Sequence, residues 1–130
     1  MSAKTPSGTL AIRTMAMPKD TNASGAIFGG WLMSQMDLAG GITAAKRAGG
    51  RVVTVSVSAM EFHEPVNVGD VLSCYAEIEK IGTTSIQVRV EAWVEHRLRQ
   101  KEVKSFMATL GTFTFVALDE NGKKCPVPSA

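Results

Sequence analysis

The pattern of hydrophobic and polar positions divides the chain into strand-like segments and one helical segment. The clearest alternation covers residues 83–96, where one face carries Ile86, Val88, Val90, Ala92 and Val94 and the other carries Gln87, Arg89, Glu91, Trp93 and Glu95. This period of two predicts a strand with one buried face. Alternation and β-branched content also predict strands over residues 9–17, 51–62 and 71–81. Residues 104–118 are apolar on both faces, as is typical of a strand that is covered on both sides.

One long helix is predicted from Gly29 to the glycine stop at Gly49 and Gly50, with Lys46 and Arg47 in its last turn. Apolar residues lie on nearly all of its sides, namely Trp31, Leu32, Met33, Met36, Leu38, Ile42, Ala44 and Ala45. Such a helix is expected to be buried nearly all round. Its internal pair Gly40-Gly41, at a cost of about 1 kcal/mol per glycine relative to alanine, indicates a backbone packed closely against another element.

The order of elements is one strand, the long helix, and four strands joined by short turns, which predicts an α+β fold with an antiparallel five-stranded sheet. To bury the helix, the sheet must curl around it, and a second protomer is expected to cover the rest. Residues 1–8 are small and polar and are expected to be disordered. Residues 9–130 are expected to form a single domain.

Charge and cysteine content narrow the class of protein. Fourteen Lys and Arg stand against twelve Asp and Glu, without a long basic run, so the balance does not indicate a nucleic-acid partner. Cys74 and Cys125 follow no signal peptide and are expected to be reduced thiols in a cytoplasmic protein. The stretch 27–45 is long enough to be considered as a membrane span, but Gln35, Asp37 and four glycines argue against that reading.

Asp37 is the first candidate for chemistry, because it is the only ionisable side chain between Asp20 and Lys46. A carboxylate here could simply bond to a neighbouring group at a helix interface. Burying an unpaired carboxylate is costly, however, so its charge-free surroundings favour a functional role. The pair Gly29-Gly30 ahead of it leaves backbone N–H groups open at the positive end of the helix dipole, where a developing oxyanion could bind. Close packing at a tight turn would require the same glycines.

The spacing of these candidates matters, because seven residues from Gly30 to Asp37 span roughly 10 Å of helix. Both groups therefore cannot act on one carbonyl from the same helix. If both are used, Gly29 and Gly30 of one protomer face Asp37 of the other, and the site lies across a dimer interface.

The remaining polar candidates carry weaker signals. Asn22 could make a local turn in its loop or take part in the site, and the sequence favours neither reading. His63 and His96 lack further ligands at metal spacing, so no metal site is expected. The sequence holds no serine elbow, P-loop or dinucleotide fingerprint. Cys74 alternates with apolar residues and is expected in the core.

With the helix and the acid placed, the stretch AMPKDTNASGAIFGGWLMSQMDLAG resembles the YciA-like acyl-CoA thioesterases of the hotdog-fold superfamily. The resemblance continues through GRVVTVSVSAMEFHEPVNVGDVLSCYAEIEKIGTTSI and ends in FTFVALDENGKKCPVP, so it covers residues 10–128. It implies a sheet wrapped around a central helix, homodimers with a continuous sheet and shared active sites, and commonly a trimer of dimers. It also implies hydrolysis of acyl-CoA thioesters without a cofactor, since coenzyme A is part of the substrate and the product.

The resemblance also assigns roles to residues. Asp37 aligns with the catalytic aspartate, Asn22 with an active-site asparagine from the neighbouring unit, and Gly29 and Gly30 with the turn that polarises the carbonyl. Contacts to CoA are implied for Arg51, Thr54, Lys80, Gly82, Thr84 and Ser85. The chain departs from the family at Thr83, where many relatives carry arginine, and at Ala26, which replaces a residue that is often polar or acidic in the family. Lys123 and Lys124 could supply compensating charge. We expect Trp31, Met33, Met60 and Phe62 to line the acyl pocket, where methionines can adapt to several acyl shapes.

Two other functions stay open at this stage. A hotdog hydratase or dehydratase would pair a histidine with the acid, and here only His63 could serve. A non-catalytic acyl-CoA sensor would need a partner domain, for which a chain of 130 residues has no room.

Overall fold

A computed structural model of the chain describes residues 5–97 and 103–129. The elements are β1 (Thr9–Met15), a short 3-10 helix η1 (Pro18–Asp20), α1 (Gly29–Ala48), β2 (Val52–Phe62), β3 (Val71–Ile81), β4 (Ser85–Arg97) and β5 (Val103–Ala117). The predicted helix and all five predicted strands are therefore present, and the α+β class is confirmed.

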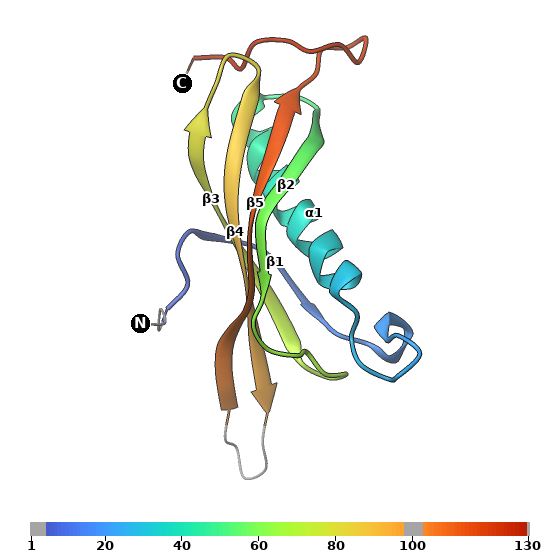
Figure 1. The fold of residues 1–130 in the computed structure, drawn as a ribbon. Coiled ribbons are helices and arrows are strands. Elements are labelled where there is room, and N and C mark those ends of the chain that lie inside the picture. The colour runs from blue at the N-terminus through green and yellow to red at the C-terminus, as the bar shows by residue number, and fades with distance from the viewer. Residues whose placement is uncertain (1–4, 98–102, 130) are drawn as a thin grey trace.

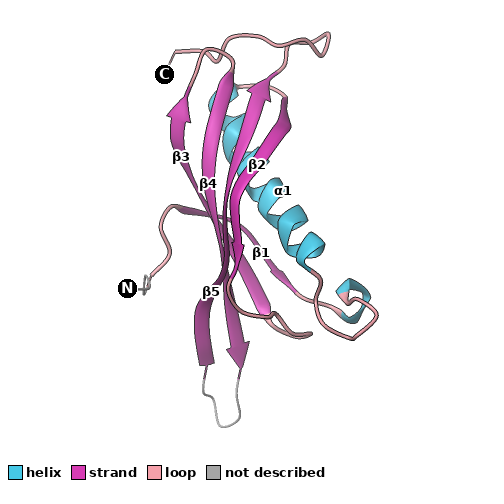
Figure 2. Ribbon diagram, viewed as in Figure 1, coloured by secondary structure: helices cyan, strands magenta, loops and turns pink. Residues whose placement is uncertain are grey.

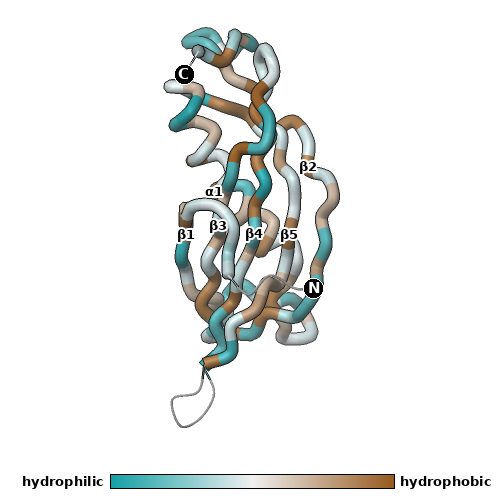
Figure 3. The backbone as a smooth tube through the Cα atoms, turned by 90° about the vertical axis from the view of Figure 1, so that its left-hand side faces the viewer, coloured by the Kyte–Doolittle hydropathy of each residue, from teal (hydrophilic) through white to brown (hydrophobic). Residues whose placement is uncertain are grey.

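The strands form one antiparallel sheet in the order β1-β3-β4-β5-β2, and α1 lies along one of its faces (Figures 1 and 2). β4 is the middle strand, and its residues Ile86, Val88, Val90, Ala92 and Val94 are buried as predicted. Hydrophobic and hydrophilic residues alternate along the strands in Figure 3. Because β1 and β2 are the two edges of this sheet, each has one side of its backbone without a partner strand among the described residues.

α1 ends as predicted at Gly49, whose φ of 71° is the left-handed conformation that glycine adopts without strain. Gly40 faces the Phe115 ring and Val90, and an added Cβ would lie 3.0 Å from that ring. The close approach expected from the glycine pair is therefore confirmed at Gly40. Burial on nearly all sides is not reached in a single chain, because Leu38 is 55% exposed and Ile42 51% exposed. One sheet covers only one face of this helix.

β2 does not alternate as its sequence predicted. Its pairing with β5 shifts register between Thr54 and Ser56 and again between Ser58 and Glu61, and Ala59 in the second irregularity has a φ of 52°. Each extra residue of a bulge moves the following side chains to the other face. The side chains on the helix side of β2 are consequently Val52, Thr54, Val57, Met60 and Phe62.

The polar face of β4 is also more buried than the alternation predicted, and Glu91 is only 1% exposed. Its carboxylate accepts hydrogen bonds from Arg89, from the Trp93 indole at 2.8 Å and from the backbone N–H of Ser7 at 3.1 Å. These hydrogen bonds compensate for the free-energy cost of burying the Glu91 carboxylate. They also hold Ser7 on the sheet, in a segment that was expected to be disordered. Residues 1–4 of that segment lie outside the described residues.

Among the described residues, none of the helices has the length and hydrophobicity needed to cross a membrane.

Candidate active site

Asp37 and Thr54 form the centre of the candidate site. Thr54 Oγ1 donates a hydrogen bond of 2.6 Å to Asp37 Oδ1, the short distance typical of a hydroxyl bonded to a carboxylate. The two side chains meet because Asp37 lies midway along α1 and Thr54 precedes the first irregularity of β2, on its helix side. The bond uses one carboxylate oxygen and fixes the orientation of the other.

The surroundings of Asp37 are apolar, as the sequence indicated. The carboxylate is half-buried and borders two hollows between α1 and β2. One, of about 270 Å³, is lined by Gly30, Met33, Ser34, Asp37, Thr54, Val57 and Phe113. The other, of about 390 Å³, is lined by Asp37, Leu38, Gly41, Ile42, Ala45, Val52, Thr54 and Phe115. Neither wall contains a cationic side chain, so the hydroxyl of Thr54 is the group that stabilises the charge of Asp37.

The first turn of α1 carries the second candidate feature. The N–H groups of Gly29 and Gly30 donate no hydrogen bond to any residue that the structure describes. Two aromatic rings occupy the space where these glycines lack side chains: Phe62 lies over Gly29, and Phe28 lies over Gly30. The N–H groups are thus at the positive end of the helix dipole and beside apolar surface, an arrangement that suits an oxyanion.

Gly30 and Asp37 line the same smaller hollow, at its two ends. They belong to one uninterrupted helix, so the separation expected from the sequence, roughly 10 Å, holds. The amides and the carboxylate of one chain therefore do not converge on a single carbonyl.

Asn22 organises the loop that leads into α1. Its Oδ1 accepts hydrogen bonds from the Ser24 backbone N–H, the Ser24 hydroxyl and the Ala26 backbone N–H. Its backbone N–H also donates to the Ala26 carbonyl at 2.7 Å. These hydrogen bonds form a local turn, which was one of the two roles considered for Asn22 from the sequence. The exposed Nδ2 makes no hydrogen bond within the described chain, so the same side chain is still able to donate to another group.

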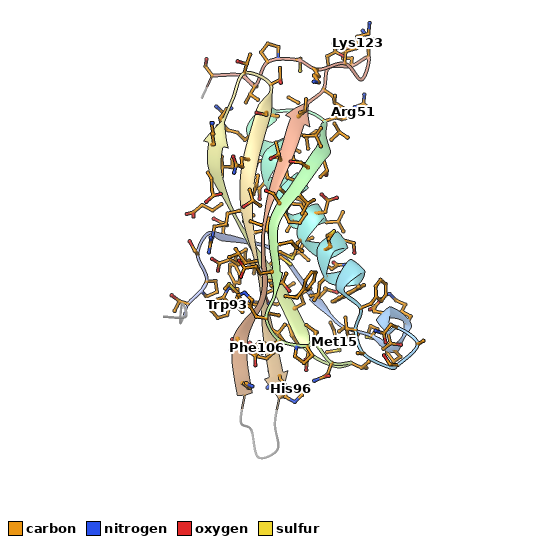
Figure 4. The ribbon with its side chains drawn as sticks, viewed as in Figure 1. Met15, Arg51, Trp93, His96, Phe106 and Lys123 are labelled. Carbon is orange, nitrogen blue, oxygen red and sulfur yellow. The ribbon has the colours of Figure 1, made fainter. Side chains whose placement is uncertain are left out.

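The predicted CoA contacts do not all lie together. Arg51 and the turn at residues 82–85 meet at one end of the sheet, because the end of β5 bonds to both: Leu118 N–H donates to the Arg51 carbonyl, and Ala117 N–H donates to the Thr84 carbonyl. Figure 4 places Arg51 and Lys123 at this same end. Lys80 ends β3 nearby, and the turn closes through Gly82 N–H and the Ser85 carbonyl. Thr54 is separate from this group and lies beside Asp37.

The predicted acyl-pocket residues are likewise divided. Trp31 is a buried residue of the core, and it lines none of the hollows between α1 and β2. Met33 lines the smaller hollow beside Asp37. Phe62 lines a third hollow of about 400 Å³, with Ile27, Gly29, Leu32, His63, Glu64, Pro65 and Val66. Met60 packs on the core beside Gly111.

No histidine or cysteine lines the two hollows that Asp37 borders. His63 bonds to Glu61 at 3.1 Å and His96 bonds to the buried Asp70 at 2.5 Å. No cluster of metal-ligating side chains occurs within residues 5–97 and 103–129. Burial raises the pKa of the Cys74 thiol to about 12, so this thiol stays protonated and unreactive at neutral pH.

The chain matches known proteins over nearly its full length. The family model for the thioesterase superfamily matches residues 24–100. The acyl-CoA thioester hydrolase YciA of Salmonella typhimurium is 53% identical over 124 residues, which are 95% of this chain and 93% of that protein. A solved hexameric broad specificity acyl-coenzyme A thioesterase is 48% identical with a TM-score of 0.91, and the match covers 97% of this chain and 85% of that one.

A more distant solved structure bears on individual residues. The acyl-CoA hydrolase of Staphylococcus aureus is 37% identical with a TM-score of 0.80, and the match covers 91% of this chain and 70% of that one. It has been solved with butyryl coenzyme A and also with alanine replacing an asparagine, an aspartate or a threonine. Those three positions are spaced along that chain as Asn22, Asp37 and Thr54 are spaced here. The position of Thr54 on the helix side of β2, opposite Asp37, is what sequence reasoning missed.

Proposed function

We propose, because this chain belongs to the YciA-like acyl-CoA thioester hydrolases of the thioesterase superfamily, that it hydrolyses acyl-CoA to the free acid and CoA. The hotdog arrangement of one sheet around one helix is common to this chain and to its solved relatives. The observation that carries the proposal is the carboxylate of Asp37, held by Thr54 at 2.6 Å between two apolar hollows.

In this mechanism Asp37 acts on water as a general base, or attacks the thioester carbon directly as a nucleophile. In the first route, water attacks the carbonyl carbon while its proton passes to Asp37. Backbone N–H groups at a helix N-terminus stabilise the oxyanion that forms. The intermediate then collapses, the C–S bond breaks, and the departing sulfur takes the proton to give the CoA thiol.

In the direct route, the carboxylate forms an anhydride with the acyl group and expels the thiolate, and water then hydrolyses the anhydride. A single turnover in labelled water tests for the direct route. Label in Asp37 supports the covalent route, because it requires water to attack the Asp37 carbonyl carbon of the anhydride.

The oxyanion donors for Asp37 come from a second copy of the chain in this proposal. The two-turn separation of Gly30 and Asp37 along α1 supports this, as does the apolar surface that one chain leaves uncovered. Val53 and Val55 are exposed on the edge strand β2, and Leu38 and Ile42 are exposed on α1. Pairing of the β2 edges of two chains would continue the sheet from one chain into the other. It would also cover these exposed residues of β2 and α1. Gly29 and Gly30 of the partner subunit would then face Asp37, and the partner's Asn22 would orient the water or the acid through Nδ2.

Assembly beyond the dimer is proposed from the relatives. Solved thioesterases 48% and 51% identical to this chain are hexameric, which supports a trimer of dimers here. For the CoA phosphates we propose Arg51, Lys80 and the turn at residues 82–85, at the end of the sheet to which the larger hollow leads. Lys123 lies at this end and can supply the positive charge that is absent at position 83, where this chain has threonine instead of arginine.

The structure gives less support to a hydratase or dehydratase. Such an enzyme would pair a histidine with the acid, but His63 lines the third hollow, whereas Asp37 lines the other two. No histidine borders Asp37 in either of those hollows.

Release of free thiol from a panel of acyl-CoA esters tests the proposal. A thioesterase releases one thiol per ester, a hydratase alters only the acyl group, and a binding protein does neither. We expect stoichiometric thiol release. Bound but unchanged acyl-CoA, or a changed acyl group on intact thioester, would overturn the proposed function.

A further inference from the structure

The three hollows between α1 and β2 follow one another along a single line. Gly29, Met33, Asp37, Gly41 and Ala45 are spaced four residues apart on α1 and so form one row on the helix surface. Gly29 lines the third hollow, Met33 and Asp37 line the smaller one, and Asp37, Gly41 and Ala45 line the larger one. Along this row Asp37 therefore has the smaller hollow on one side and the larger hollow on the other. The third hollow lies beyond the smaller one.

Met60 lines none of the three hollows, but it lies in β2 between a residue that lines the smaller hollow and one that lines the third. On the helix side of β2 it lies between Val57, which lines the smaller hollow, and Phe62, which lines the third. The second irregularity of β2, at Ala59, turns Met60 toward the helix. Its thioether occupies the space above Gly111, because a Cβ at residue 111 would lie 2.5 Å from Met60 Sδ and 3.7 Å from Met36 Cε.

We propose that the acyl chain runs from Asp37 through the smaller hollow toward the third, and that Met60, seated on Gly111, ends this path and sets the acyl length. This inference rests on the proposed function. The larger hollow leads in the opposite direction, toward Arg51, and so is left for the CoA arm. The third hollow fits an acyl tail because most of its walls are apolar and it begins at Gly29, at the helix N-terminus.

The contact between Met60 and Gly111 allows two substitutions with opposite effects on the room for the acyl chain. In this proposal Met60→Ala removes the side chain that separates the two hollows, so longer acyl chains gain room. Gly111→Ala places a methyl group where the thioether lies, and the flexible methionine must move into the path. One methylene more or less in an apolar pocket changes kcat/KM by about 10-fold or more, so a shift of this size is expected in each direction.

The test measures kcat/KM for butyryl-CoA and lauroyl-CoA. We expect Met60→Ala to raise the lauroyl-to-butyryl ratio about 10-fold and Gly111→Ala to lower it by a similar factor. In the double variant, Gly111→Ala should have no further effect, because no thioether remains to be displaced. Met15→Ala, a half-exposed methionine at the end of β1 and outside the three hollows, is the control and should leave the ratio unchanged.

If Gly111→Ala fails to fold, Met60→Phe replaces it, since a rigid ring blocks the same path and should also lower the ratio. Unchanged ratios in the Met60 variants, or a Gly111→Ala effect that persists without Met60, would overturn this inference alone. Failure of the wild-type protein to hydrolyse any acyl-CoA would overturn the proposed function as well.

Discussion

The hydroxyl of Thr54 donates to the carboxylate of Asp37 at 2.6 Å and joins the edge strand β2 to the middle of α1. A hydrogen bond to a charged group in an apolar site contributes more than one between neutral groups. Thr54 is thus placed to fix the carboxylate orientation and to stabilise its charge, without having to touch the substrate. We regard it as a positioning residue.

Thr54→Val keeps the shape of the side chain and removes the hydroxyl. Loss of a hydrogen bond to a charged group costs about 1.5–3 kcal/mol, so kcat should fall roughly 10-fold to 100-fold. Thr54→Ser restores the donor and should recover most of kcat. The two variants should differ mainly in kcat, since the bond acts on the carboxylate. Equal kcat in Thr54→Val and the wild type would show that Asp37 needs no such partner.

The proposed shared site predicts complementation between inactive subunits. An Asp37→Ala chain retains Gly29, Gly30 and Asn22, and an Asn22→Ala chain retains Asp37. In mixed dimers one of the two sites is therefore intact. Refolding the two variants together should restore part of the thiol release that each lacks alone. Mass spectrometry must confirm that mixed dimers formed; no recovery from such dimers would place the whole site in one chain.

Sequence reasoning predicted the elements well because their signals are local. The buried apolar face of β4 and the glycine stop at Gly49 each depend on neighbouring residues, and both are found as predicted. The isolation of Asp37 from other ionisable side chains was likewise visible in the sequence.

The rest depended on contacts between distant residues. The irregularities of β2 are set by its register with β5, and they decide which side chains face the helix. The burial of Glu91 depends on Ser7, 84 positions away. Thr54 and Asp37 are 17 positions apart, and nothing in the local pattern distinguishes a threonine beside the acid from one beside CoA.

Alanine substitutions at Gly40 and Gly41 provide a matched test of how closely α1 packs on the sheet. A Cβ at Gly40 would lie 3.0 Å from the Phe115 ring, whereas one at Gly41 would lie at an ordinary 3.6 Å. Gly40→Ala should lower the free energy of unfolding by about 1–3 kcal/mol through overpacking. Gly41→Ala should raise it by up to about 1 kcal/mol through helix propensity. Denaturant unfolding at one protein concentration measures both, and equal effects would contradict this difference in packing.

The thiol of Cys74 should resist alkylation in the folded protein. Its pKa is raised to about 12 by burial, so the reactive thiolate forms only as pH approaches that value. Iodoacetamide at neutral pH should leave Cys74 unmodified until denaturant is added. Peptide mass spectrometry locates the label, and rapid modification of Cys74 in the native protein would show that β3 is more open than its packing indicates.

The most direct test of the account is thiol release from acyl-CoA by Asp37→Asn, with the assembly verified by size-exclusion chromatography. Asparagine keeps the size of the side chain and removes its charge and basicity, so only the chemical role is lost. We predict that kcat falls by at least about 100-fold while the oligomer stays intact. Turnover close to that of the wild-type protein would contradict the assignment of Asp37 as the catalytic base or nucleophile.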